Sequence, residues 1–382
     1  MDTKAQLGVC GSGTMGIGIA QLAAANGHRV LLFDINRENA QKGIDALSST
    51  LTQLENKGKI NNEQKSEILG RIEIIESVND FKEAEIIIEA IVENLDVKKS
   101  FFSSVEEVVS EDCILCSNTS SISITSIGSS LRNASRFLGL HFFNPAPVMP
   151  LVEIVPGLRT DISYVSNCQS LMETWNKVPV KVQDLPGFLV NRIARPFYGE
   201  ALRIVEENIA TTPEVDHAMK KHGGFKMGPF ELMDLIGVDV NFLVTKTVYK
   251  DFFFDPKYKP SLLQQRMSEA GLLGRKSGKG FYNYPREEEH VNMDEKESYD
   301  IFLRIISMLV NEAVEAKRLK IASHEAIELA MTKGVNYPKG LLLWGEEIGY
   351  DKINQKLDEL HEYYQEERYR RSPLLNSLSK GI

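Results

Sequence analysis

Residues 6–34 read QLGVCGSGTMGIGIAQLAAANGHRVLLFD. This segment begins with a short apolar run, turns at a group of glycines, continues with helix-forming residues and ends in a second apolar run before Asp34. We therefore expect a strand, a tight turn, a helix and a second strand. Gly11, Gly13 and Gly16 have the G-x-G-x-x-G spacing, which allows a tight turn, a close approach of a pyrophosphate and close packing of the helix on the strand.

The context of this turn indicates which dinucleotide it binds. A helix N-terminus favours negative charge, so we expect Thr14 and Met15, at the start of the helix, to lie beside the phosphates. Asp34 ends the second strand, where a carboxylate accepts hydrogen bonds from a ribose and disfavours a 2′-phosphate. The sequence therefore predicts NAD as the cofactor, although Arg37 leaves NADP open.

The alternation of strand and helix continues beyond this segment. Further apolar strands are expected at Arg71–Ile75, Ala84–Ile91, Cys113–Ser117, Phe137–Phe142, Leu151–Val155 and Val178–Val182. Continuous apolar strands separated by helices predict a mainly parallel sheet with both faces covered. The expected fold class is thus an α/β, Rossmann-like N-terminal domain over residues 1–184.

The remainder of the chain has a helical pattern. We expect a first helical domain over residues 185–285, a polar linker at Pro285–Glu297 and a second helical domain over residues 296–382. The second helical domain is an internal repeat, because a shift of 112 residues aligns 48 positions without a gap. The matched pairs include Arg192 with Arg304, Glu200 with Glu312, Gly228 with Gly340 and Gly237 with Gly349.

The composition of the 382 residues excludes several classes of protein. A net charge of -9 argues against a broad nucleic-acid surface, and no apolar run has membrane-spanning length. The first strand begins so early that no room remains for a signal peptide. Four cysteines do not suggest a disulfide framework, and Cys113 and Cys116 fall on opposite faces of a strand without further metal ligands. We expect a cytoplasmic protein that binds no metal, nucleic acid or membrane.

A histidine and a glutamate lie on neighbouring apolar segments. His141 ends one strand at the carboxyl edge of the sheet, and Glu153 lies inside the next apolar run. A carboxylate there is costly to bury without a partner. A chain that doubles back between the two would bring them together, so that Glu153 orients the imidazole. Histidine is suited to take a proton from an alcohol as hydride leaves, but a structural pair remains equally open.

The segment HFFNPAPVMPLVEIV, residues 141–155, resembles the signature region of the 3-hydroxyacyl-CoA dehydrogenase family. The stretches GSGTMGIGIA, VENLDVKKS, SNTSS, PGFLVNR, MGPFELMDLIGVD and GRKSGKGFYNY are similar to motifs of that family in the same order. The stretch GVNYPKGLLLWGEEIGYDKI is typical of a second helical copy, as in bacterial members of the 3-hydroxybutyryl-CoA dehydrogenase type with a duplicated helical domain.

This resemblance implies residue roles and an activity. His141 matches the catalytic base, Glu153 its partner, Ser120 the residue at the substrate hydroxyl and Asn191 the residue at the substrate oxygen. The expected reaction is NAD-dependent oxidation of a short 3-hydroxyacyl-CoA to the 3-ketoacyl-CoA. The predicted NAD contacts are Gly11, Gly13, Thr14, Met15, Gly16, Asp34, Glu93, Lys98, Asn118, Ser120, Asn144 and Lys276. Lys57 and Lys59 are the expected contacts of coenzyme A, with a solvated helix end as the alternative.

Rival interpretations stay open at this stage. A sugar-acid dehydrogenase of the gulonate type has a similar His/Glu pair, and a non-catalytic, crystallin-like protein could retain NAD binding. A β-hydroxyacid dehydrogenase would need a catalytic lysine, which the His141–Glu153 segment disfavours. Phe252, Phe253 and Phe254 are expected to pack between helices, with a lining of the acyl pocket as the alternative. We expect a monomer or homodimer in which residues 299–382 imitate a dimer partner of the first helical copy.

Overall fold

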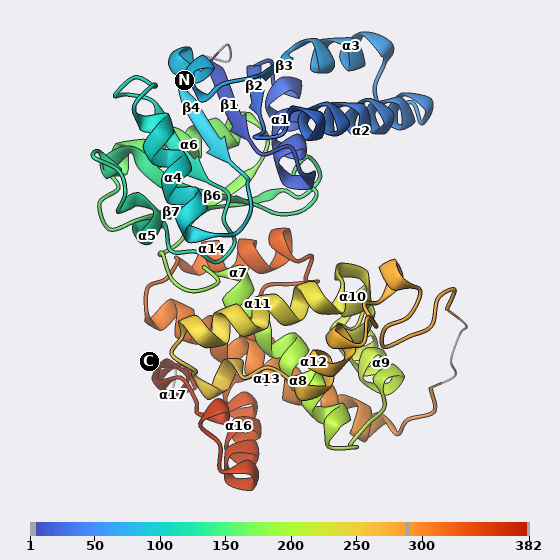
Figure 1. Ribbon diagram of the computed structural model, residues 1–382. Helices are drawn as coiled ribbons and strands as arrows, with labels where there is room; N and C mark the ends of the chain where they lie inside the picture. Colours follow the sequence, from blue (N-terminus) through green and yellow to red (C-terminus); the bar gives the residue numbers. More distant parts are fainter. Residues whose placement is uncertain (1–4, 287–290, 380–382) are drawn as a thin grey trace. The chain divides into compact units, whose positions relative to one another are not determined.

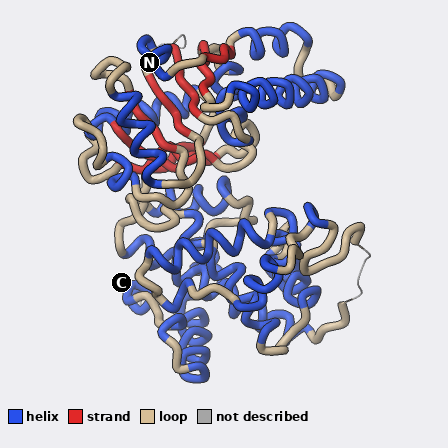
Figure 2. Tube along the Cα trace, in the orientation of Figure 1, coloured by secondary structure: helices blue, strands red, loops and turns tan. Residues whose placement is uncertain are grey.

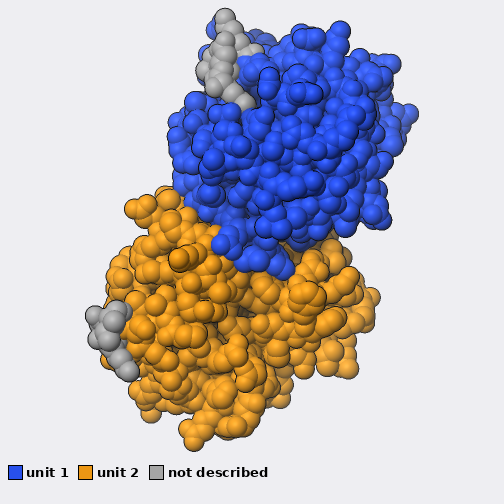
Figure 3. Space-filling view, turned by 90° about the vertical axis from the view of Figure 1, so that its left-hand side faces the viewer, with its two compact units in different colours: residues 1–188 blue, residues 189–382 orange. Residues whose placement is uncertain are grey.

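A computed structural model describes residues 5–286 and 291–379. The chain divides into two compact units, residues 1–188 and residues 189–382, coloured separately in Figure 3. The strands lie in the first unit, and the second unit is helical (Figure 2). The α/β fold class predicted from the sequence is confirmed. The division of the second unit into two helical domains remains an interpretation of the repeat.

The sheet of unit 1 has the strand order β3-β2-β1-β4-β5-β6-β7-β8 (Figure 1). All neighbouring strands pair in parallel except β6 and β7, which pair antiparallel. The bounds are β1 Gln6–Cys10, β2 Arg29–Phe33, β3 Ile72–Ile75, β4 Ile86–Glu89, β5 Ile114–Ser117, β6 Phe137–Phe142, β7 Leu151–Pro156 and β8 Val178–Lys181. Every strand expected from the sequence is present, and β6 matches its predicted bounds.

Helices cover both faces of this sheet. Alternate side chains of the strands, such as Val9 and Leu140, join one core with helices α1, α2 and α6. On the other face Phe102 of α4 contacts Phe137 of β6, with ring centroids 4.7 Å apart. The helical segments of unit 1 are α1 Thr14–Ala25, α2 Arg37–Asn56, α3 Asn62–Gly70, η1 Val78–Glu83, α4 Leu95–Glu106, α5 Ile124–Gly128, η2 Ala134–Arg136 and α6 Ile162–Thr174.

The helices of unit 2 recur in the same order. The first series is α7 Val190–Ile193, α8 Arg195–Glu206, α9 Thr212–Gly223, α10 Pro229–Ile236, α11 Val238–Asp251, η3 Pro256–Tyr258, α12 Leu262–Glu269 and η4 Arg275–Ser277. The second is α13 Glu295–Arg318, α14 His324–Leu329, η5 Ala330–Gly334, α15 Leu341–Ile348, α16 Tyr350–Tyr364, η6 Glu367–Tyr369 and α17 Pro373–Leu378. Helices α10 and α15 coincide at the 112-residue offset, and so do their glycine boundaries.

One boundary of the helical part differs from the prediction. The polar linker was expected to last until Glu297, but α13 begins at Glu295. The Asp294 carboxylate accepts hydrogen bonds from the backbone N–H groups of Lys296 and Glu297, so it caps the helix. Residues 287–290 of the expected linker lie outside the described residues. Among the described residues, no helix is long and apolar enough to cross a membrane.

Candidate active site

The glycine loop lies where the strand order of the sheet reverses. Strand β1 pairs with β2 on one side and β4 on the other, and ligands of open α/β sheets bind at such a switch point. Gly11 has φ +95°, and a Cβ on it would come within 2.5 Å of the Ala90 carbonyl oxygen after β4. A Cβ on Gly16 would meet the Gly11 oxygen at 1.9 Å. These two positions therefore require glycine.

Gly13 has the opposite surroundings. A Cβ built there meets nothing within 4 Å, so the space in front of this loop is open. Gly13 also caps α1, whose first residues are Thr14 and Met15, and an exposed helix N-terminus of this kind attracts phosphate. The combination of a tight turn with an open front fits the pyrophosphate of a dinucleotide.

Asp34 is tied directly to the glycine loop. Its Oδ2 accepts hydrogen bonds from the backbone N–H of Ser12 at 2.9 Å and from the Ser12 hydroxyl at 2.5 Å. Its Oδ1 accepts from the backbone N–H of Asn36 at 3.0 Å. These three donors hold the carboxylate at the end of β2, beside the loop. This is the place where the adenosine ribose of a dinucleotide is recognised.

A buried charge network follows β4. The Lys98 ammonium lies 2.6 Å from Glu89 and 3.3 Å from Glu93, and the Lys98 side chain is 1% exposed. The Ser117 hydroxyl and the Ile91 N–H also donate to Glu89. Lys98, predicted as a cofactor contact, thus has its charge directed at two carboxylates. Sequence reasoning missed Glu89, although a glutamate at the end of an apolar strand signals a buried cation nearby.

Glu93 connects this network to the SNTSS segment. It accepts hydrogen bonds from the Thr119 hydroxyl at 2.6 Å, the Ser120 N–H at 3.1 Å and the Ser121 hydroxyl at 3.2 Å. Burial opposes ionisation, but Lys98 and these donors outweigh it and lower the pKa of Glu93. The ionised Glu93 therefore fixes the loop that carries Ser120.

Asn118 follows the end of β5, and Asn144 lies just beyond the end of β6. The Asn118 amide oxygen accepts from the backbone N–H of Phe142 at 2.8 Å, which links β5 to the residue after His141. Asn144 is exposed, two residues beyond β6. The structure therefore places Asn118, Ser120 and His141 on adjacent strand ends of unit 1.

His141 and Glu153 are directly opposite each other in the antiparallel pairing of β6 and β7. The His141 Nδ1 lies 2.7 Å from Glu153 Oε2, and both side chains are buried, Glu153 completely. The predicted return of the chain between them is confirmed. Because Nδ1 is engaged by the carboxylate, Nε2 is the ring nitrogen that can exchange a proton with a substrate.

Aromatic rings enclose the imidazole. The ring centroids of Phe143 and Phe188 lie 4.6 Å and 5.7 Å from that of His141. Sequence reasoning did not assign either phenylalanine to the site. Apolar surroundings strengthen the interaction between the imidazole and Glu153, because less water screens it.

Four predicted contacts remain: Asn191 and Lys276 belong to unit 2, and Lys57 and Lys59 belong to unit 1. Asn191 is half-buried on α7, and Lys276 forms an ion pair with Asp239 at 2.6 Å, both within unit 2. Lys57 and Lys59 are exposed just after α2 in unit 1. Their assigned roles toward NAD, substrate and coenzyme A stay predictions.

The structure agrees with the prediction for the cysteines but not with the prediction for Phe252, Phe253 and Phe254. All four cysteines are buried and free, and burial raises the pKa of Cys113 to about 12, so they are packing residues as expected. The expectation that all three phenylalanines pack between helices is wrong. Phe252 stacks on Tyr258, but Phe253 is 93% and Phe254 60% exposed, because both residues adopt positive φ after the end of α11.

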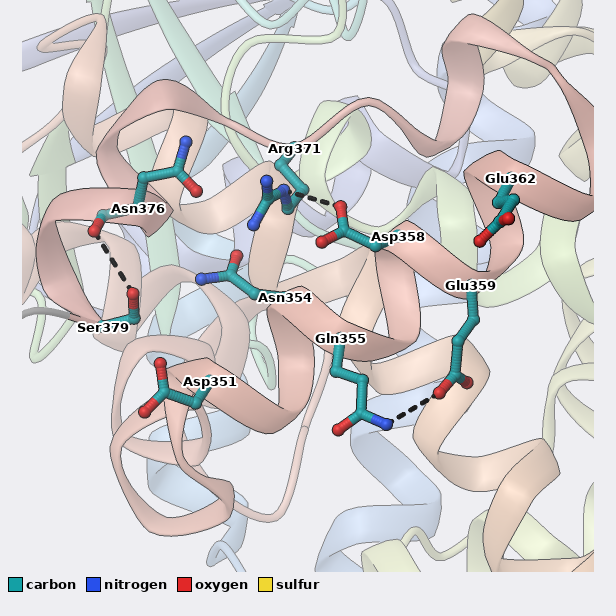
Figure 4. A pocket seen from close by; sticks show the side chains of 9 residues that line it. All are labelled: Asp351, Asn354, Gln355, Asp358, Glu359, Glu362, Arg371, Asn376 and Ser379. Carbon is teal, nitrogen blue, oxygen red and sulfur yellow. Dashed lines mark hydrogen bonds and ion pairs between the residues drawn. The ribbon is translucent and has the colours of Figure 1, made fainter.

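The second helical copy contains a separate hollow of about 750 Å³, shown in Figure 4. Its lining includes four carboxylates, those of Asp351, Asp358, Glu359 and Glu362, against one cation, Arg371. The Arg371 guanidinium already pairs with Asp358 at 2.9 Å. An acidic surface of this kind repels the phosphates of a dinucleotide or of coenzyme A. This hollow therefore does not have the character of a second dehydrogenase site.

Comparison with known proteins agrees with this geometry. The sequence profile of the 3-hydroxyacyl-CoA dehydrogenase NAD-binding domain matches residues 6–185. The profile of the 3-hydroxyacyl-CoA dehydrogenase C-terminal domain matches twice, at residues 187–284 and 301–381. The two profiles together account for most of the chain.

Individual relatives are similar over long stretches. The chain is 36% identical to the 3-hydroxyadipyl-CoA dehydrogenase of Escherichia coli K12, over 96% of both chains. It is 42% identical to the 3-hydroxybutyryl-CoA dehydrogenase of Clostridioides difficile, over 73% of this chain and 99% of that protein. A crystal structure described as 3-hydroxybutyryl-CoA dehydrogenase from Escherichia coli K12 matches with a TM-score of 0.94 and 35% identity, covering 100% of this chain and 99% of the other.

The glycine loop at the switch point, the Asp34 carboxylate and these matches lead to the same result. The chain belongs to the 3-hydroxyacyl-CoA dehydrogenase family of NAD-dependent oxidoreductases.

Proposed function

We propose that the chain interconverts a short 3-hydroxyacyl-CoA and the corresponding 3-ketoacyl-CoA, with His141 as the acid–base group. The observation that carries this proposal is the buried hydrogen bond between His141 Nδ1 and Glu153 at the carboxyl edge of the sheet. Bound NAD would accept the hydride from C3 of the substrate.

The residues of this chain supply the proton chemistry. In the oxidation, His141 Nε2 takes the proton of the C3 hydroxyl while hydride leaves C3. The imidazolium that forms is stabilised by the Glu153 carboxylate on the other ring nitrogen. In the reduction, the same imidazolium returns the proton to the substrate oxygen.

Two further residues are proposed to hold the substrate oxygen. Ser120 lies in the loop fixed by Glu93 and would hydrogen-bond the C3 oxygen. Asn191 would donate to the substrate oxygen and stabilise charge that develops there. Gly13, the N-terminus of α1 and Asp34 would hold the pyrophosphate and the adenosine ribose.

The test is an assay of the purified full chain with acetoacetyl-CoA and NADH. We expect NADH to be consumed, which is measured as a loss of its absorbance. We also expect the reverse reaction with 3-hydroxybutyryl-CoA and NAD. An L-gulonate and NAD control should remain flat. Activity with the sugar acid but with no acyl-CoA thioester would overturn the proposal.

The cofactor preference provides a second expectation. Asp34 is partly buried and already holds Ser12, so a 2′-phosphate would meet a fixed negative charge. We expect kcat/KM for NADH to exceed that for NADPH by roughly tenfold or more, a value reached by about 1.4 kcal/mol of repulsion. Asp34→Ser should narrow the difference. Equal kcat/KM values for the two cofactors in the wild type would contradict the role of Asp34.

A further inference from the structure

One of the buried arginines of unit 2, Arg195, lacks a carboxylate partner among the described residues. Four arginines in the described part of this unit have almost completely buried side chains: Arg192, Arg195, Arg304 and Arg368. Three of them pair with glutamates, Arg192 with Glu312 and both Arg304 and Arg368 with Glu200. Arg195 forms no ion pair with any described residue of the unit. A buried cation without a carboxylate is costly, so its retention needs a reason.

The contacts of Arg195 leave part of its guanidinium unused. Its Nε donates to the Asn191 carbonyl oxygen at 2.8 Å, and its Nη1 donates to the Thr245 hydroxyl at 3.1 Å. The guanidinium carbon lies 5.1 Å from the centre of the Tyr198 ring. A guanidinium has five N–H donors, and these two hydrogen bonds use only Nε and one N–H of Nη1. Burial lowers the pKa of Arg195, against the opposing influence of Tyr198 and Tyr337.

A buried hydroxyl without a partner lies near Arg195 and belongs to Tyr337. This side chain is 5% exposed, and its buried hydroxyl has no hydrogen-bond partner among the described residues. It lies close enough to interact electrostatically with Arg195 and Tyr198. A buried hydroxyl without a partner is destabilising. A guanidinium without an ion pair and a hydroxyl without a hydrogen-bond partner, among the described residues, therefore lie in the same part of unit 2.

Comparison of the two copies of the repeat shows that Arg195 is not part of the packing that both copies share. At the 112-residue offset the paired residues Arg192 and Glu200 recur as Arg304 and Glu312, but Arg195 becomes Ser307. Asn191, the predicted substrate contact, becomes Leu303 at the same offset. Arg195 and Asn191 thus occur together, and only in the copy that is predicted to meet the substrate.

The second copy also departs from the repeat where it touches α7. Helix α9 of the first copy is α-helical throughout, whereas its counterpart α14 continues into the π-helix η5. This π-helix contacts α7 and directly precedes the loop that carries Tyr337. Such π-helical turns are frequent at functional sites.

We propose that Arg195 and the Tyr337 hydroxyl form a subsite for a carboxylate at the far end of the acyl chain, so that the substrate is the CoA thioester of a 3-hydroxy dicarboxylic acid. This inference rests on the proposed function, in which Asn191 holds the substrate oxygen. Arg195 follows Asn191 by one helical turn, a rise of about 6 Å. In a six-carbon acyl group the distal carboxylate lies two methylene groups beyond C3, which matches this short span. Guanidinium and carboxylate have complementary geometry.

The experiment compares two thioesters on the full chain with NADH: acetoacetyl-CoA and 3-oxoadipyl-CoA, which carries a terminal carboxylate. We expect the wild type to have a higher kcat/KM for 3-oxoadipyl-CoA. Arg195→Met should lower the ratio of the two kcat/KM values by roughly 10- to 100-fold, the range for hydrogen bonds to a charged group. Tyr337→Phe should lower the same ratio by several-fold without a fall in Tm, because its hydroxyl has no hydrogen-bond partner among the described residues.

Arg192→Met is the matched control, since it removes a buried guanidinium that pairs with Glu312. It should lower Tm and leave the ratio unchanged. A wild type that turns over acetoacetyl-CoA but does not favour 3-oxoadipyl-CoA overturns the carboxylate subsite and leaves the proposed function standing. If Arg195→Met lowers kcat/KM equally for both thioesters, the carboxylate subsite is likewise overturned. Arg195 would then act by positioning Asn191. A wild type that reduces neither thioester refutes the proposed function itself.

Discussion

Replacing His141 by glutamine should lower kcat by roughly 10²- to 10⁴-fold, the contribution of a positioned general base. Glutamine keeps a polar side chain on β6 but cannot take up the hydroxyl proton. The proposed NAD contacts lie mainly on other strand ends of unit 1, so the affinity for NADH, measured by fluorescence titration, should stay near that of the wild type. Turnover like that of the wild type would remove His141 from the mechanism.

Glu153→Gln should reduce kcat to a comparable extent. The carboxylate holds Nδ1 at 2.7 Å and stabilises the imidazolium, whereas an amide supplies no charge. Because Glu153 is fully buried, the folding of this variant must be checked by Tm and circular dichroism. A folded Glu153→Gln enzyme with unchanged kcat would show that the pair is structural.

His28 offers the control for both variants. It is also a buried histidine of unit 1, and both of its ring nitrogens are occupied, Nδ1 by the Ala5 carbonyl oxygen at 3.0 Å and Nε2 by the Trp175 indole N–H at 3.1 Å. His28→Gln should lower Tm and leave kcat within about threefold of the wild type. The comparison separates the loss of a buried structural imidazole from the loss of the imidazole that is proposed to be catalytic.

The strands could be predicted because strands that are buried on both faces have short, nearly continuous runs of apolar residues. Segments such as Phe137–Phe142 are mostly apolar on both sides, a pattern that is typical of a short strand covered on both faces. Helix α3 was missed for the opposite reason. It buries only Ile68 and carries no apolar stripe, so its main signal in the sequence is the capping box of Asn61 and Gln64 at its start.

The site could be predicted where a residue type contradicts its local pattern. Glu153 interrupts an apolar strand, and this conflict indicated a buried partner, which is His141. Lys98 and Arg195 show no such conflict, because each lies in a helical segment where a basic residue is ordinarily solvated. Their burial depends on tertiary contacts, with Glu89 for Lys98 and with Thr245 for Arg195, which a single sequence does not display.

The two copies of the helical repeat pack against each other in unit 2. An ion pair from the first copy to the second recurs from the second copy to the first. Helix α13 of the second copy contacts α8 and α9 of the first. Arg192 pairs with Glu312 at 3.5 Å, and Arg304 pairs with Glu200 at 2.6 Å. Because Arg304 and Glu312 are the repeats of Arg192 and Glu200, this is one pair used twice.

Two tyrosines near these pairs are related in the same way, but at an offset of 111 residues instead of 112. The Tyr258 hydroxyl donates to Glu312, and the Tyr369 hydroxyl donates to Glu200, each at 2.7 Å. Reciprocal contacts of this kind define an isologous interface between identical subunits. The second copy thus supports the first as a partner subunit would, although it is held on the same chain at high effective concentration.

Truncation after Tyr284 should therefore convert the protein into a dimer or an aggregate. Without α13 and η6, Glu200 loses Arg304 and Tyr369, and the apolar face of α8 is bared. Two truncated chains can restore one contact by placing Arg192 of each beside Glu200 of the other. We expect light scattering to show twice the mass of the truncated chain, or larger particles.

Charge exchange makes this prediction specific. In the truncated chain, Arg192→Glu alone places two carboxylates together and should abolish the dimer. Adding Glu200→Arg should restore it, because each substituted residue then meets its opposite on the partner chain. The same two substitutions in the full chain should lower Tm, since Arg304 and Glu312 keep their original charges and each pair becomes a repulsion. A truncated chain that stays a soluble monomer with full activity would contradict the argument, because the second copy would then cover nothing that the first copy requires.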